Sequence, residues 1–148
     1  MVEAGAPVGV IMAELSHGPL HVEAYAEAVR TPAVGAVATF VGTVRDHSPD
    51  AAGPVVELQY SAHPDAATVI RTVAEQVAAD HPGVRLAVGH RVGILGVGDA
   101  ALVAAVADAH RGEAFDACRE LVEQVKAQLP VWKKQVIADG THTWVGSA

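Results

Sequence analysis

DAHRGEAFDACRELVEQVKAQLPVWKK, residues 108–134, carries all three lysines and two of the seven arginines of a chain whose formal net charge is −7. Apolar side chains recur at three- and four-residue steps from Glu113 to Leu129, which is the pattern of a helix with one buried face. Pro130 has no backbone donor and disfavours helical conformation at the preceding residue, so the helix is expected to end at Leu129. The segment therefore predicts a polar turn, a helix and an exposed basic tail on extended chain.

Cationic side chains lie near both ends of this predicted helix. Lys126 falls in its last turn and Lys133 follows just beyond Pro130. An ammonium group that is close to other cations or partly desolvated can act as a base, and one that stays charged can stabilise an anion. His110 and Arg111 precede the helix, where unpaired N–H groups favour anions. The segment thus indicates an anion-binding, proton-handling site, although a solvated tail and an ordinary surface turn remain the structural alternatives.

Other candidate residues are weighed in the same way. Arg45 ends an apolar strand just before a loop, which is a common place for a ligand contact. The alternative is an ordinary charge at a strand end, paired with Asp46. Cys118 lies on the apolar face of its helix, which predicts a buried structural thiol. Phe40 and Trp132 could stack on a flat ring or pack in the core. A lone cysteine excludes a multi-cysteine metal site, and no metal or cofactor is predicted.

Length and charge restrict the class of protein. A chain of 148 residues predicts one domain, 1–148, that buries roughly two-thirds of its unfolded surface. The acidic balance argues against a general nucleic-acid binder. No apolar run approaches the roughly 20 residues of a membrane span, and no signal peptide is evident. We therefore expect a soluble, cytoplasmic protein.

The remaining sequence alternates strand and helix patterns. The predicted order is β-α-β-β-α-β-β-α-β, which favours an α+β fold over a doubly wound parallel sheet. The expected strands are 8–15, 34–45 (one long strand or a bent hairpin), 55–61, 84–93, 100–109 and a final strand and turn within 135–145. The other expected helices are 21–30 and 65–80. We expect a loop at 47–54 and a tight connection at 94–99.

Five motifs in register resemble the large, catalytic subunit of molybdopterin synthase. They are FVGTVRDH (40–47), HRVGILGVGD (90–99), AHRGEAFDAC (109–118), KxxxPxWKK (126–134) and DGTHTWV (139–145). The resemblance extends from residue 34 to residue 145 and implies an α/β-hammerhead fold with an additional antiparallel β-sheet.

The same resemblance implies an activity and its partners. The expected activity is that of a sulfurtransferase that converts cyclic pyranopterin monophosphate to molybdopterin by adding two sulfurs. A small ubiquitin-like carrier subunit would deliver each sulfur as a thiocarboxylate on its C-terminal Gly-Gly, threaded into a pocket of the large subunit. A homodimer of large subunits with two carriers would form a heterotetramer, and the resemblance implies no cofactor.

Site residues follow from the motif positions. Lys126 and Lys133 match the essential lysines and are expected to hold the thiocarboxylate and assist proton transfers. Arg45, His110 and Arg111 match anion-binding residues. The other expected substrate contacts are Thr43, Val44, Lys134 and Gln135, with Phe40 in the same pocket region.

Two departures and two alternatives accompany this hypothesis. Many relatives carry a basic residue in place of Thr43, and many continue past the position of Ala148 with a charged tail. A non-catalytic module that docks a Gly-Gly tail would share the fold but would not need both lysines. A sensor of small phosphate ligands would use His110 and Arg111 but would leave Lys133 without a role.

Overall fold

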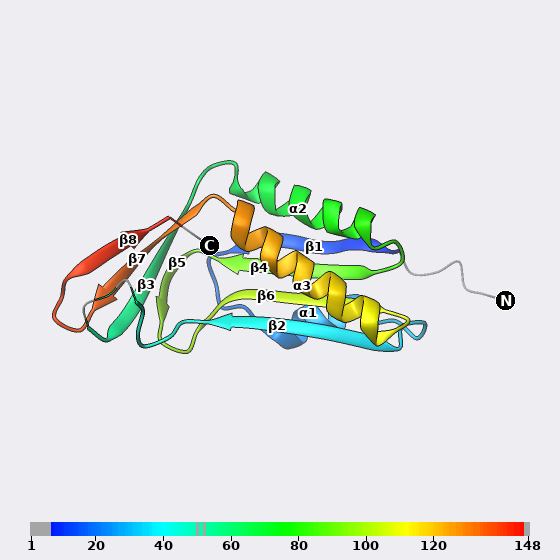
Figure 1. Cartoon of the computed structure of the whole chain (residues 1–148), viewed down its shortest axis with the longest axis horizontal. Helices are drawn as coiled ribbons and strands as arrows, with labels where there is room; N and C mark the ends of the chain where they lie inside the picture. The colour runs from blue at the N-terminus through cyan, green and yellow to red at the C-terminus, as the bar shows by residue number, and fades with distance from the viewer. Residues whose placement is uncertain (1–6, 50, 52, 147–148) are drawn as a thin grey trace.

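Two β-sheets and three helices form the described part of the chain (Figure 1). The computed structural model describes residues 7–49, 51 and 53–146. Both the α+β class and the additional antiparallel sheet are confirmed. In chain order the elements are β1 (Gly9–Ser16), α1 (Val22–Val29), β2 (Ala36–Thr43), β3 (Val55–Ala62), α2 (Ala66–Asp80), β4 (Arg85–Arg91), β5 (Gly93–Gly96), β6 (Ala100–Asp108), α3 (Arg111–Gln128), β7 (Val131–Ile137) and β8 (His142–Val145).

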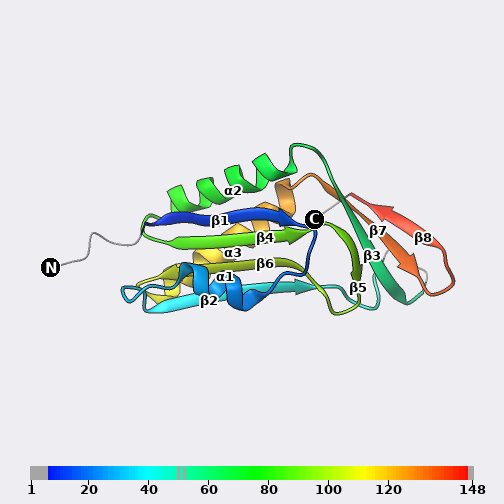
Figure 2. The same ribbon diagram turned by 180° about the vertical axis from the view of Figure 1, so that it is seen from behind.

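The larger sheet, which is the one with the longer strands, has helices packed on both of its faces. Its strand order is β1-β4-β6-β2; β1 runs parallel to β4, and the other pairs are antiparallel. Helices α2 and α3 cover one face and α1 covers the other (Figures 1 and 2). Strands β4 and β6 are therefore buried on both faces, which explains the nearly continuous apolar run of β6, AALVAAVAD, and the apolar centre of β4, Leu86–Val88.

The second sheet is antiparallel throughout, with the order β5-β3-β7-β8, and lies beyond one end of the larger sheet (Figure 1). Its inner face carries Leu58 and Leu95, which belong to the same apolar core as α2 and α3. Its outer face leaves Ile94, Trp132 and Trp144 exposed. The two sheets therefore share one core and meet along a junction.

Two predictions about local structure were wrong. The segment after Pro130 is not an exposed tail but β7, an interior strand between β3 and β8. Lysines are uncommon in interior strands, but here the Lys133 side chain lines a cavity, so its charge does not enter the apolar core. The expected tight connection 94–99 is partly β5, and only its end turns, at Gly98 with a φ of 89°.

Smaller features follow the sequence more closely. Residues 34–45 contain one strand, β2 (Ala36–Thr43), and not a hairpin, with a register shift after Gly42. Gly35 approaches the backbone of Ala109 so closely that a Cβ would lie 2.5 Å from its carbonyl oxygen. Asp50 and Ala52, in the predicted loop 47–54, are outside the described residues. Within the described ranges, no helix has both the length and the apolar character needed to cross a bilayer.

Candidate active site

A cavity of about 200 Å³ lies at the junction of the two sheets. Its walls come from the end of β2 and the loop that follows, from the facing ends of β4 and β6, from the last turn of α3, and from the inner face of the second sheet. The lining residues are Gly42, Thr43, Val44, Arg45, His47, Ser48, Val55, Leu58, Tyr60, His90, Ala101, Leu102, Lys126, Lys133 and Gln135.

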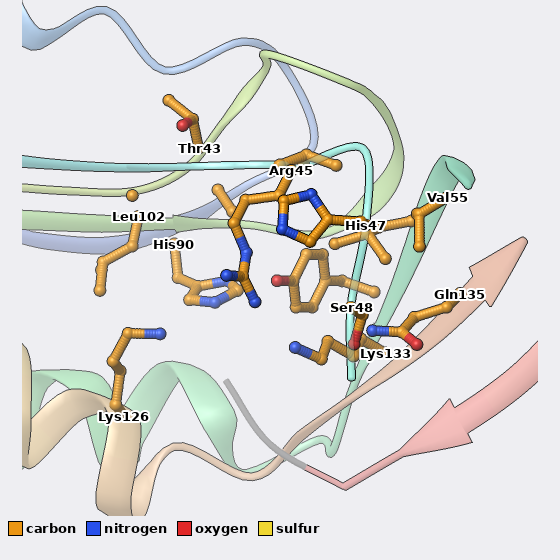
Figure 3. A pocket seen from close by; sticks show the side chains of 15 residues that line it. Thr43, Arg45, His47, Ser48, Val55, His90, Leu102, Lys126, Lys133 and Gln135 are labelled. Atoms are coloured by element: carbon orange, nitrogen blue, oxygen red, sulfur yellow. The ribbon is translucent and has the colours of Figure 1, made fainter. Parts of the chain in front are cut away.

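Three cationic side chains from three different elements enter this cavity. Figure 3 shows the guanidinium of Arg45 and the ammonium groups of Lys126 and Lys133 directed into the same space. Lys126 lies in the last turn of α3, which ends before Pro130 as predicted. Arg45 follows β2, and Lys133 belongs to β7. Since the chain as a whole is acidic, this is a local concentration of positive charge that suits an anion.

Strand alternation decides which residues of β7 can reach the cavity. Successive side chains of a strand point to opposite faces, so Lys133 and Gln135 face inward and Lys134 faces outward. The Lys134 ammonium lies 6.0 Å from the ring centroid of Trp144, outside the cavity. The two neighbouring lysines are therefore on opposite sides of the second sheet.

Gln135 adds a polar group to the cavity wall. Its side chain is buried, and its Oε1 accepts no hydrogen bond from the described residues. A buried acceptor without a partner raises the free energy of the folded chain, and a donor on a bound molecule would remove that cost. Gln135 is therefore suited to contact a ligand N–H or O–H.

His90 and Tyr60 form an uncharged part of the wall. His90, at the end of β4, is only 1% exposed, and its Nδ1 lies 2.7 Å from the carbonyl oxygen of Arg91. The ring of Tyr60 meets it edge-on, with centroids 4.9 Å apart. Burial, together with the nearby Lys126 charge, lowers the pKa of His90 to about 4, and burial raises the pKa of Tyr60. Both groups are therefore neutral at pH 7.

His110 and Arg111 are not brought to this cavity within one chain. They lie at the N-terminal end of α3, whereas Lys126 is in its last turn. With a rise of about 1.5 Å per residue, the two ends are separated by roughly 20 Å. His110 and Arg111 instead line a separate hollow with Gly35. The anion-binding residues expected from sequence thus divide into two groups.

Phe40 and Cys118 lie together elsewhere. Both line an apolar groove between β2 and α3, beside the exposed ring of Phe115. Cys118 is buried as predicted, and burial raises the pKa of its thiol to about 11, so it is not a thiolate at neutral pH. No cluster of three or more His, Cys, Asp or Glu side chains able to hold a metal ion occurs among the described residues.

Comparison with known proteins identifies the family. The family model for MoaE protein matches residues 15–128. The chain belongs to the MoaE family. It is 42% identical, over 135 residues, to molybdopterin synthase catalytic subunit 1 of Mycobacterium tuberculosis. The aligned region covers 89% of this chain and 88% of that protein. MoaE-family membership makes the chain a sulfur-transferring enzyme of molybdopterin formation.

Solved structures agree with this MoaE-family assignment. The molybdopterin synthase structure from Staphylococcus aureus superposes with a TM-score of 0.79 at 28% identity, covering 94% of this chain and 96% of that one. A chain from the complex of subunits 1 and 2 of the molybdopterin-converting factor from Helicobacter pylori shares the fold, with a TM-score of 0.68 at 20% identity over 92% and 89% of the two chains.

Several residues that line the cavity of this MoaE-family chain were not singled out from the sequence. The polar ones are His47, Ser48, Tyr60 and His90. A signal for His90 was present, because Leu86, Val88 and His90 alternate on the face of β4 that α2 and α3 cover. A histidine at a position where the pattern predicts an apolar core residue is unusual and marks a polar cavity.

Proposed function

We propose that the cavity at the junction of the two sheets is where sulfur passes from the carrier thiocarboxylate to cyclic pyranopterin monophosphate. The observation that carries this proposal is the convergence of Arg45, Lys126 and Lys133 on one cavity in an acidic chain. Both reactants are anions, and fixed cations in a partly desolvated site attract them and stabilise negative charge that develops during the reaction.

Each cation has a proposed role. Lys126 and Lys133 hold the thiocarboxylate and assist the proton transfers that accompany attack on the pterin side chain. Arg45 offers a planar fork suited to the cyclic phosphate. Thr43, Val44 and Gln135 line the substrate. Phe40 and Lys134 face other surfaces of the chain, so the proposal assigns them to contacts with a second subunit and not with the pterin.

The proposed assembly also gives His110 and Arg111 a role. These residues cannot reach the cavity of their own chain along α3, so the proposal places them at the cavity of a second copy in a homodimer, where they would bind phosphate. Each cavity would receive the Gly-Gly end of one ubiquitin-like carrier, which makes a heterotetramer. Glycines suit a narrow passage because they have no side chains. A reducing, cytoplasmic setting would protect the thiocarboxylate and the dithiolene from oxidation.

Turnover with purified thiocarboxylated carrier tests the proposal. Lys126→Ala and Lys133→Ala should each lower kcat by about a hundredfold or more, because each removes a charge that stabilises the reacting anions. Lys134→Ala should have a much smaller effect, since its ammonium lies on the outer face.

Arg71→Ala is the control for loss of a cation, because Arg71 is exposed on α2, pairs with Glu75 and lies outside the cavity. Carrier binding should be unchanged in Arg71→Ala and should persist, though weakened, in Lys126→Ala and Lys133→Ala. If Lys126→Ala or Lys133→Ala turned over at nearly the normal rate, the proposed site would be wrong. Carrier binding without turnover by the unaltered protein would favour a docking module instead.

A further inference from the structure

His90 is a buried polar side chain in the wall of the cavity to which the roles above give no task. It occupies the end of β4, opposite Leu102 of β6, on the face that otherwise carries Leu86 and Val88. An apolar residue at this position would extend the core. A histidine there introduces a polar group that needs partners, so its presence requires an explanation.

The contacts of His90 fix which ring nitrogen carries the proton. Nδ1 lies 2.7 Å from the carbonyl oxygen of Arg91, and a carbonyl can only accept a hydrogen bond. Nδ1–H is therefore the donor, which leaves the lone pair on Nε2. The Tyr60 ring packs against the imidazole at an interplanar angle of 81° and restrains its orientation. A flipped ring would lose the hydrogen bond to Arg91.

The surroundings of His90 keep it uncharged. Lys126 approaches from α3, Arg45 from the segment after β2 and Lys133 from β7 (Figure 3). Burial raises the pKa of the Tyr60 phenol on β3, so this group is neutral. Burial, the larger effect, and the Lys126 charge lower the pKa of His90, and they outweigh the hydrogen bond to Arg91, which acts in the opposite direction. The cavity therefore contains a neutral hydrogen-bond acceptor among three cations.

We propose that His90 is a positioning residue for Lys126, whose ammonium group donates a hydrogen bond to the Nε2 lone pair. The inference rests on the proposed function, in which Lys126 acts on the thiocarboxylate. A lysine side chain has four flexible carbons and loses much rotamer freedom when it is held in one place. The fixed imidazole restrains the ammonium group at the cavity surface.

The chemistry of the site explains why this acceptor is a histidine. An aspartate or glutamate in the same place would also orient Lys126, but its charge would neutralise the field that attracts anionic reactants. A neutral imidazole accepts a hydrogen bond without cancelling the charge of the ammonium. His90 thus orients the cation and leaves the cavity positive.

Two substitutions distinguish the hydrogen bonds made by the two ring nitrogens of His90. In His90→Gln the amide reaches the place of Nε2 and can still accept from Lys126, whereas in His90→Asn the shorter amide replaces Nδ1 and can bond only to Arg91. His90→Asn should lower kcat by about tenfold, with little change in KM for the carrier, because one hydrogen bond to a charged group is lost. His90→Gln should retain about a third of the rate or more. The control is His21→Gln, at an exposed position before α1 that makes no side-chain cap.

A double substitution tests whether His90 acts through Lys126. If it does, Lys126→Ala/His90→Asn should be no slower than Lys126→Ala alone, whereas independent or merely structural defects would multiply. Multiplied defects, or equal rates for His90→Gln and His90→Asn, would overturn the inference. If Lys126→Ala itself were nearly normal, the proposed function would fail, and that result is distinct from normal turnover by His90→Asn alone, which rejects only the role of His90.

A measurement on the unaltered protein needs no turnover. Nitrogen-15 NMR of the histidine rings should show His90 as the neutral Nδ1–H tautomer throughout pH 6–8. An imidazolium or an Nε2–H tautomer at pH 7 would overturn the inference, because neither leaves a lone pair on Nε2. This readout remains decisive even if a His90 variant folds poorly.

Discussion

Lys133 and Lys134 are neighbours in β7, yet their ammonium groups lie on opposite faces of the second sheet. Motif matching gave both residues to the substrate, because a motif records which residues are present and not where they point. Strand geometry separates them, since every second side chain faces the same way. The chemistry proposed for the cavity therefore depends on the register of β7.

Cys118 gives a prediction about a single side chain. Cys118→Ser should leave kcat within about twofold, because in the proposed function sulfur comes from the carrier, and because burial keeps the thiol protonated. Stability should fall by about 1 kcal/mol, since a hydroxyl replaces a thiol on the buried face of α3. Turnover assays and urea unfolding measure the two effects. A large loss of kcat in a well-folded Ser variant would show that the thiol takes part in the reaction.

Helix α3 organises both groups of cations, with Lys126 at one end and His110 and Arg111 at the other. Its N-terminal half is tied to α2 through His81, which follows the end of α2. One ring nitrogen of His81 bonds to Glu113 and the other to Glu120, both on α3. The two helices are thus joined by an imidazole placed between two carboxylates.

This connection between helices predicts a pH-dependent stability. The hydrogen bond to Glu113, with a further contribution from Glu120, raises the pKa of His81 despite partial burial. A pKa that is higher in the folded state than in the unfolded state stabilises the folded protein. The whole of this stabilisation is present at pH values below the unfolded-state pKa, about 6.5, and it is lost as the pH rises through the folded-state pKa. His81→Gln should therefore lower the free energy of unfolding by about 1 kcal/mol at pH 6 and by less at pH 9.

Urea unfolding at the two pH values measures this difference, with His21→Gln as the control at an exposed position. An equal loss for His81→Gln at pH 6 and pH 9 would mean that the charge on His81 does not stabilise the contact between α2 and α3.

Periodicity predicted most elements but not the environment of each residue. The helix that ends before Pro130 and the strands around Leu58 and Val103 follow from local pattern. The strand β5 was missed because glycines at both of its ends resemble turn residues, and the pairing with β3 that stabilises it is non-local.

The candidate site was predictable only in part, because contacts between distant segments decide which residues line the cavity. Motif positions gave Arg45, Lys126 and Lys133, which line one cavity. The alternation of Leu86, Val88 and His90 marks His90 as unusual, but which face of β4 is turned toward α3 depends on packing, because β4 is buried on both faces. The distance between His110 and Lys126 follows from helix length, but whether a second chain spans that distance depends on assembly.

The proposed homodimer predicts complementation between inactive chains. If His110 and Arg111 serve the cavity of the other copy, an Arg111→Ala chain co-expressed with a Lys126→Ala chain should give mixed dimers with one intact cavity. Random pairing makes half of the dimers mixed, and one of the two cavities in each mixed dimer is intact. Activity should therefore reach about a quarter of the unaltered level. Each variant alone should be nearly inactive in the turnover assay. No recovery in verified mixed dimers would contradict the shared site.

The single-domain organisation expected from chain length stays a prediction. Residues of both sheets, including Leu58 from β3 and Leu86 from β4, contribute to the same apolar core. A shared core supports cooperative folding of the whole chain, because neither sheet can bury its inner face alone.

The cavity lies where the two sheets meet, and β2, β3, β4, β6, β7 and α3 each contribute part of its wall. Because the sheets share one core, a chain in which either sheet has come apart would also lose the cavity that, in the proposed function, receives the carrier tail. Incompletely folded chains would then not consume thiocarboxylated carrier, because in the proposed function only a chain with both sheets in place can receive its tail.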